Sequence, residues 1–245
     1  MTQSPDLDGR TALVTGSATR VGRELLLRIA DCGADVAVHY RESEAEATAT
    51  AAEAREQGVD ATTVQGDITH PNEVDAMFDT AENELGRVDV LVNNVGNFDA
   101  RHWEAIEWDA WRSVVESTFY GTVLCSRRAV GGMRDQGWGR IINIGFADSD
   151  RMHAPPVNFP YFVAKTGVLM FTRMLAGDTQ DDGVTVNAVS PFAVENTVSD
   201  VSKFPRGRAA SFEDVAAPLL FFLSESAAYI SGENVAVDGG RLTES

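Results

Sequence analysis

The sequence has little of what would indicate a secreted, metal-binding or membrane protein. Its 245 residues include only two cysteines, Cys32 and Cys125, which stand far apart in helical patterns. Neither a disulfide nor a metal site is therefore expected, and a reduced, cytoplasmic setting fits this composition. The chain also lacks a run of roughly 18 apolar residues and a charged-then-apolar N-terminal stretch, so we expect no membrane span and no signal peptide.

Lysine is equally scarce. Of the 20 basic residues only Lys165 and Lys203 are lysines, and 37 acidic residues bring the net charge to −17. Such an acidic surface repels phosphate backbones and anionic lipids, so neither nucleic acid nor membrane is expected as a partner. Because salt would screen the repulsion between its own charges, we predict a protein adapted to a salt-rich cytoplasm, such as that of a halophilic microbe. The alternative is an organism of high GC content, which also prefers arginine to lysine.

Short apolar segments alternate with helical patterns along the chain. This alternation predicts a parallel sheet with helices on both of its faces. With no internal repeat and no linker, 245 residues are expected to form a single α/β domain. Strands are predicted near residues 11–15, 35–40, 61–66, 88–93, 139–145, 184–189 and 234–237.

A glycine-rich turn, Thr15 to Gly22, follows the first predicted strand and precedes a helical pattern over residues 23–30. A strand, a glycine-rich turn and a helix in this order form the setting in which a phosphate can approach the free N–H groups of a helix N-terminus. The turn therefore favours nucleotide binding, although an ordinary strand-to-helix connection has the same outline.

Tyr161 and Lys165 stand four residues apart in a predicted helix, which places both side chains on one face. A phenol with its ordinary pKa near 10 is a poor acid or base at neutral pH. A neighbouring ammonium favours the phenolate, so we predict that Lys165 lowers the pKa of Tyr161. Such a pair suits general acid–base work on a carbonyl or hydroxyl oxygen.

Six segments together resemble the short-chain dehydrogenase/reductase family, in the family's order and over about residues 8–240. The resemblance implies a single Rossmann-type domain over residues 1–245 with a doubly wound, seven-stranded parallel sheet, a nicotinamide cofactor and hydride transfer. The segments are Thr15-Gly16…Gly22, Asp67-Ile68, Asn93-Asn94-Val95-Gly96, Tyr161…Lys165, Asn187-Ala188-Val189-Ser190-Pro191 and Gly232…Val237-Asp238-Gly239-Gly240.

The end of the second predicted strand favours NADP(H) over NAD(H). An NAD site usually carries an acidic residue there, which accepts a hydrogen bond from the ribose 2′-hydroxyl. This strand ends with His39 and Tyr40 and is followed by Arg41, Glu42 and Ser43. Arg41, aided by His39 or Ser43, could meet a 2′-phosphate, although Glu42 could compete for its charge.

Arg20 occupies the second glycine position of the family's turn, where its guanidinium could also reach that phosphate. The resemblance assigns the remaining cofactor contacts. Gly16, Thr19, Val21 and Gly22 would line the phosphates, Asp67 and Ile68 the adenine, Asn93 and Gly96 the nucleotide, and Pro191, Thr197, Tyr161 and Lys165 the nicotinamide end.

Two positions depart from the family's pattern. Aligned without gaps, Phe146 stands where the family has its serine, and Thr118 stands where it has a helix asparagine. Asp148 or Ser149 could replace the serine, and Thr118 could keep part of a proton relay. Otherwise the tyrosine and lysine suffice with the cofactor, or the protein is a catalytically weak sensor or scaffold.

Taken together, these residues predict an NADPH-dependent reductase that transfers hydride to a C=O or C=N bond of a small molecule. Tyr161 is the predicted proton donor. Phe98, Phe146 and Phe192 are expected to line an apolar, ring-accepting pocket.

Arg20 and Asp148 resemble the pteridine-reductase branch of the family, whereas the general pattern resembles carbonyl and 3-oxoacyl reductases. The resemblance also implies a homotetramer, or a homodimer, formed through helices near residues 108–134 and 161–178, with Val168, Phe171 and Leu175 as one candidate face.

Overall fold

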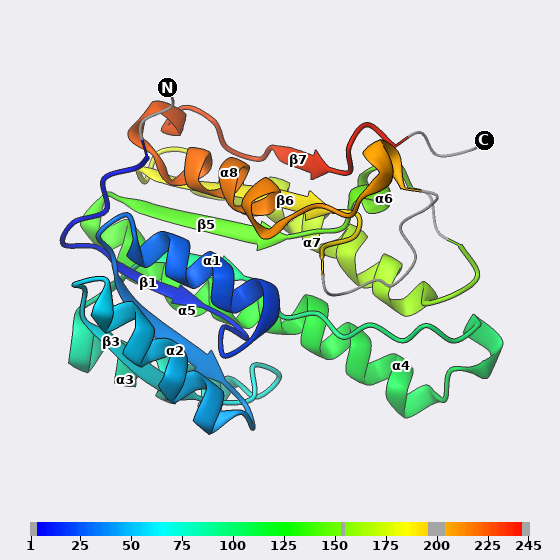
Figure 1. Cartoon of the computed structure of the whole chain (residues 1–245), viewed down its shortest axis with the longest axis horizontal. Coiled ribbons are helices and arrows are strands. Elements are labelled where there is room, and N and C mark those ends of the chain that lie inside the picture. The colour runs from blue at the N-terminus through cyan, green and yellow to red at the C-terminus, as the bar shows by residue number, and fades with distance from the viewer. Residues whose placement is uncertain (1–3, 153–154, 196–203, 242–245) are drawn as a thin grey trace.

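A seven-stranded parallel sheet forms the centre of the molecule (Figure 1). The computed structural model describes residues 4–152, 155–195 and 204–241. The strand order is β3-β2-β1-β4-β5-β6-β7, and every neighbouring pair is parallel. The predicted fold class is therefore confirmed. The strands are β1 (Thr11–Val14), β2 (Asp35–Tyr40), β3 (Ala61–Gln65), β4 (Val88–Asn93), β5 (Gly139–Ile144), β6 (Val184–Pro191) and β7 (Asn234–Val237).

Helices connect these strands and cover both faces of the sheet. Short 3₁₀ turns and one π-helical turn, η2 (Glu116–Tyr120), interrupt the connections. Within the described ranges, no helix combines the length and the apolar character needed to cross a membrane. The helices are α1 (Arg20–Ala30), α2 (Glu44–Glu56), α3 (Pro71–Leu85), α4 (Trp108–Val115), α5 (Gly121–Gln136), α6 (Ala147–Asp150), α7 (Phe159–Asp178) and α8 (Phe212–Leu223).

Successive residues of each strand point to opposite faces of the sheet, which divides the core in two. Val14 of β1 packs in a cluster with apolar residues of α1, α2 and α8. Its neighbour Leu13 packs on the other face with residues of α3, α5 and α7. The strands are buried on both faces and therefore read as nearly continuous apolar runs in the sequence.

The strand order reverses direction between β1 and β4. From β1 the chain proceeds outward through β2 and β3, and then returns to pair β4 with the other side of β1. The loops that follow these two strands therefore leave in opposite directions. Ligands of such sheets bind in the crevice that opens there, beyond the carboxyl ends of the strands.

Candidate active site

The glycine-rich turn between β1 and α1 lies at this carboxyl edge. Gly16 has a φ of +65°, a left-handed conformation that favours glycine. A Cβ atom on Gly22 would lie 2.4 Å from the carbonyl oxygen of Gly16, so no side chain fits there. Thr19 is exposed and Val21 is half-buried in the same turn. The turn therefore leaves bare backbone at the N-terminus of α1, as a bound phosphate requires.

His39 holds this turn from inside the protein. Its side chain is buried, the Gly16 N–H donates to its Nδ1 at 2.8 Å, and its Nε2 donates to the Gly66 carbonyl oxygen at 2.9 Å. Burial lowers the pKa of His39 and keeps the ring neutral, as an accepting Nδ1 requires. Both ring nitrogens are engaged, which removes His39 from the predicted contacts to a 2′-phosphate.

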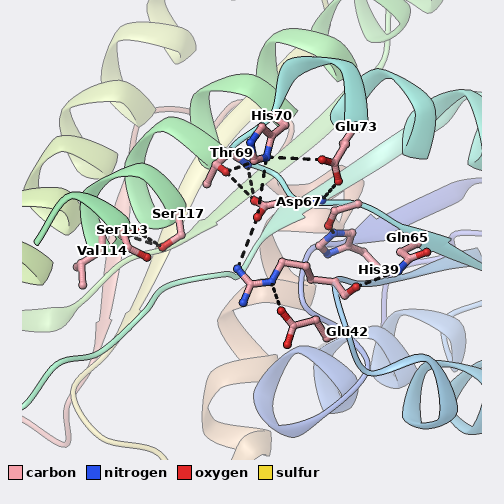
Figure 2. Close-up of polar contacts among 12 residues, drawn as sticks. His39, Glu42, Gln65, Asp67, Thr69, His70, Glu73, Ser113, Val114 and Ser117 are labelled. Atoms are coloured by element: carbon pink, nitrogen blue, oxygen red, sulfur yellow. Dashed lines mark hydrogen bonds and ion pairs between the residues drawn. The ribbon is translucent and has the colours of Figure 1, made fainter. Parts of the chain in front are cut away.

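Arg41 is already paired with carboxylates. Its Nε lies 3.2 Å from Glu42, and its Nη1 lies 3.6 Å from Asp67. Asp67 also accepts hydrogen bonds from the backbone N–H and the hydroxyl of Thr69 (Figure 2). Partial burial alone would raise the pKa of Asp67, but these hydrogen bonds and the Arg41 charge lower it overall. A 2′-phosphate would have to compete with two carboxylates for Arg41. Ser43 stands beside this group at the N-cap position of α2.

Arg20 is exposed, and its guanidinium forms no ion pair or hydrogen bond with any residue that the structure describes. Its φ of +54° is left-handed, a conformation that costs a residue with a side chain about 1 kcal/mol or more. Despite this strain, Arg20 thus places beside the glycine turn a cation that is unpaired among the described residues.

Two further predicted cofactor contacts point into the protein. The Asn93 side chain donates to Ser126 Oγ at 3.0 Å and to Asn143 Oδ1 at 2.8 Å, so it ties β4 to β5 and α5 rather than facing a nucleotide. Ile68 is buried and packs so closely on Gly121 that a Cβ there would lie 2.5 Å from its Cδ1.

The last two predicted contacts lie at the end of β6. Pro191 is half-buried and pairs in register with Val237 of β7. Thr197 lies outside the described residues.

Tyr161 and Lys165 lie together on the first turns of α7, against the loop that follows β4. Lys165 is buried, and its Nζ donates to the Ile144 carbonyl oxygen at 2.5 Å and lies 5.5 Å from the centre of the Tyr161 ring. A Cβ on Gly96 would lie 3.1 Å from this Nζ and 3.3 Å from the Tyr161 ring. The bare backbone at Gly96 thus leaves room beside the pair.

The charges of this pair do not follow the sequence prediction. Burial lowers the pKa of Lys165 to about 7 and raises the pKa of Tyr161 above its ordinary value. In the free protein the loss of solvation outweighs the attraction of the ammonium, so Lys165 does not lower the tyrosine pKa. Tyr161 is instead held as a protonated donor.

Phenylalanine rings surround Tyr161. The rings of Phe98 and Phe146 meet it edge-on, with centroids 5.7 and 5.8 Å away. Phe192 continues this surface, 5.8 Å from Phe146. The structure thus brings the three predicted pocket residues together with the predicted proton donor.

Asp148 does not face this pocket as a free carboxylate. It is buried, and both of its oxygens accept from Nη1 of Arg241, at 2.5 and 2.6 Å. Arg151 adds a second cation at 3.7 Å. The predicted role of Asp148 in place of the serine therefore has no geometric support, because its acceptors are occupied. No pattern in the sequence indicates Arg241, which lies 93 positions along the chain from its partner.

Thr118 lies in the π-helical turn η2 between α4 and α5. Its side chain is fully buried, and its hydroxyl has no hydrogen-bond partner among the described residues. Nearby, the Ser117 hydroxyl donates to the Ser113 carbonyl at 2.7 Å (Figure 2). π-helical turns occur often at functional sites, and a buried free hydroxyl is rare. The predicted relay role of Thr118 stays a prediction.

Comparison with known proteins identifies this arrangement. Residues 16–241 match a family model described as Enoyl-(Acyl carrier protein) reductase. The 3-oxoacyl-[acyl-carrier-protein] reductase of Synechocystis sp. is 33% identical, over 96% of this chain and 98% of that protein. The chain belongs to the short-chain dehydrogenase/reductase family. It is therefore an NAD(P)-dependent oxidoreductase of carbonyl substrates.

Solved structures of this family superpose closely on the chain. A short-chain alcohol dehydrogenase from Sinorhizobium meliloti, described as putative, matches with a TM-score of 0.89 and 30% identity, over 96% of this chain and 97% of that one. A landomycin C-6 ketoreductase with bound NADP and rabelomycin matches with a TM-score of 0.88 and 27% identity, over 97% and 98%.

The residues present fit the family's dinucleotide. Gly22 leaves no room for a side chain between α1 and the turn, Gly96 opens the backbone beside Lys165, and Arg20 offers a cation that no residue of the described ranges pairs. The described ranges hold no group of three or more histidine, cysteine or carboxylate side chains placed to bind a metal ion.

Proposed function

We propose that the protein is an NADPH-dependent reductase that transfers hydride to a small carbonyl substrate. The observation that carries this proposal is the contact of Tyr161 and Lys165 with the open backbone at Gly96, at the same sheet edge as the glycine turn. Burying a lysine beside a half-buried phenol is costly, which argues against a non-catalytic sensor or scaffold.

Each residue has a distinct task in the proposed reaction. When bound, the cofactor supplies the hydride. Tyr161, protonated across the neutral range, gives its proton to the oxygen that gains charge. Lys165 would hold the nicotinamide ribose and, once charged, favour the phenolate that remains. The surrounding phenylalanines exclude water from the donor.

The carbonyl reaction is favoured over dihydropterin reduction. The pterin hypothesis needed a free carboxylate at Asp148, and this carboxylate is bound to Arg241. Only Arg20 still supports that hypothesis. A carbonyl substrate needs no such carboxylate, and a landomycin C-6 ketoreductase is among the similar structures.

The deciding experiment follows NADPH oxidation by its absorbance, in molar potassium chloride. The substrates are simple ketones, aryl ketones, a 3-oxoacyl thioester and dihydropterins. Turnover of ketones but not of pterins is the expected result. Tight NADPH binding without turnover of any substrate would overturn the proposal in favour of a sensor.

We further propose NADP(H) as the physiological cofactor, with Arg20 as its main 2′-phosphate contact. Arg20→Gly removes the cation and relieves the left-handed strain. The variant should bind NADPH about ten- to a hundredfold more weakly, leave NADH affinity within about threefold, and be no less stable. Binding titrations with both cofactors and a thermal melt test this. Exposed, ion-paired Arg28 offers the control Arg28→Gln, which should change neither affinity.

The α7 surface supports the proposed homotetramer. Val168 and Leu175, one candidate face, lie in the core, whereas Val163, Met170 and Met174 are 47, 67 and 54% exposed. An exposed apolar patch of this kind favours a protein contact. Because the net charge is −17, assembly should need salt. Light scattering should give four times the monomer mass in molar potassium chloride and a smaller mass at low salt. A monomer at every salt concentration would exclude the tetramer.

A further inference from the structure

The proton donor Tyr161 is surrounded by the rings of Phe98, Phe146, Phe162 and Phe192, which together we call the aromatic wall. The Phe162 ring centroid lies 5.0 Å from that of Phe146 and 6.4 Å from that of Tyr161. Phe98 is 66% exposed, and Phe146, Phe192 and Tyr161 are half-buried. These rings therefore present faces and edges toward whatever approaches the Tyr161 hydroxyl.

The far end of this wall is fixed in place. The Arg241 guanidinium lies 3.9 Å from the centre of the Phe192 ring, and Asp148 holds that guanidinium with both oxygens. The Phe204 ring lies 5.5 Å from that of Phe192 and meets it edge-on. A ring held by a cation and by a second ring is a rigid stacking surface rather than a mobile one.

The described part of the site offers a substrate oxygen only one hydroxyl donor. The Ser149 and Thr118 hydroxyls are buried from solvent, and the Ser190 hydroxyl donates to Asn234 at 2.6 Å. Tyr161 is therefore left alone, with the Phe146 ring beside it.

We propose that the substrate itself supplies the second hydrogen bond: it is a planar aryl ketone with a hydroxyl ortho to the carbonyl. The aromatic wall stacks on its ring, and the ortho hydroxyl donates to the oxygen that gains charge. This inference names the substrate class of the proposed reductase and so rests on that function.

The reaction balances with these groups. Hydride from NADPH forms a C–H bond at the carbonyl carbon, and the electron pair of the C=O π bond passes to oxygen. The ortho hydroxyl hydrogen-bonds this oxygen while Tyr161 gives it a proton, which solvent later replaces on the tyrosine. The ketone is reduced to an alcohol and NADPH is oxidised to NADP⁺. One donor to such an oxyanion is worth about 10²–10³ in rate.

The test compares three isomers or analogues of one ketone. 2′-Hydroxyacetophenone has the internal donor; 4′-hydroxyacetophenone has the same electron donation without it; 2′-methoxyacetophenone has similar bulk without it. The wild type should show a kcat/KM at least about tenfold higher for the first than for either of the others. In Phe146→Ser, which restores a protein hydroxyl, this ratio should fall toward one, mainly because the other two ketones react faster. Phe146→Leu, which removes the ring without adding a donor, should keep the ratio.

The outcomes separate this inference from the function on which it rests. If all three ketones are reduced equally well by the wild type, the inference is overturned and the reductase stands. If the enzyme reduces simple ketones but none of the three acetophenones, aryl ketones are excluded as its substrate class. If none of the ketones tested supports NADPH oxidation, the proposed reductase function is wrong, and the inference fails with it.

A binding measurement tests the aromatic wall without turnover. Calorimetric titration of the NADP⁺ complex with 2′-hydroxyacetophenone should show about three- to tenfold weaker binding for Phe192→Leu than for the wild type, as loss of a stacked ring predicts. The control is Phe221→Leu on the outer surface of α8, where the phenylalanine is 42% exposed. Equal affinity in all three proteins would show that Phe192 does not contact the ligand, and would overturn its place in the proposal.

Discussion

Replacement of Tyr161 by phenylalanine is expected to lower kcat/KM for ketone reduction about 10³-fold, while NADPH affinity stays within about threefold. The substitution removes one oxygen and leaves the ring that packs on Phe98 and Phe146. General acid catalysis contributes about 10²–10⁴ in rate, and the Thr118 and Ser149 hydroxyls are buried from solvent. Stopped-flow NADPH oxidation and fluorescence titration give the two constants.

The matched control is Tyr229→Phe. Tyr229 is fully exposed and lies in the turn before β7. It should retain wild-type kinetics. If Tyr161→Phe also kept more than about a tenth of the activity, the proton would have to come from another group, and the proposed mechanism would be wrong.

The fold, and the proximity of the glycine turn, the Gly96 loop and the start of α7, were predictable from the sequence for one reason. Each depends on a short local pattern, and a parallel sheet brings the carboxyl ends of its strands to one edge. The turn at Gly16, the loop at Gly96 and the start of α7 each follow or face such an end. Once the strands were recognised, the proximity of these three segments could be predicted without further information.

The side-chain pairings were not predictable in this way. His39 and Asp148 were assigned to ligands because of their chemistry, but His39 bonds to Gly16 and Gly66, and Asp148 bonds to Arg241. These partners are far apart in the chain, so no spacing reveals them. For His39 a signal did exist: it stands in the apolar strand β2, where burial and internal hydrogen bonds are the rule.

The pKa values of the Tyr161–Lys165 pair show a second limit of the sequence. Helical spacing predicts that the two side chains share a face, and it predicts attraction between ammonium and phenolate. It does not predict how much solvent remains. Lys165 is only 2% exposed, and the desolvation of each group sets the direction of its own pKa shift.

Burial of Lys165 has a measurable consequence for stability. Its pKa falls from 10.5 to about 7 on folding. Between these values the unfolded chain binds one more proton than the folded one, so the free energy of unfolding rises with pH. The slope is about 1.4 kcal/mol per pH unit, or about 2–3 kcal/mol between pH 7 and pH 9. Above pH 9 the buried thiol of Cys125, whose pKa is raised to about 12, opposes this rise. Between pH 7 and pH 9 the lysine therefore dominates the change in the free energy of unfolding.

Lys165→Met should remove both the activity and this pH dependence. The thioether chain fills the space of the lysine stem but carries no charge, and kcat/KM should fall at least about 10²-fold. Burying an amine away from water is costly, so the variant with an apolar side chain there should be at least as stable as the wild type at pH 7.

Urea unfolding of the cofactor-free protein at pH 7, 8 and 9, in constant molar salt, measures both effects. The wild type should gain stability across this range and Lys165→Met should show a flat line. The control is Arg173→Met, an exposed position on the same helix, which should keep the wild-type slope. A wild-type curve that is itself flat would mean that Lys165 remains charged in the folded protein. In that case its ammonium would be free to act on Tyr161 before the cofactor binds, as the sequence alone suggested.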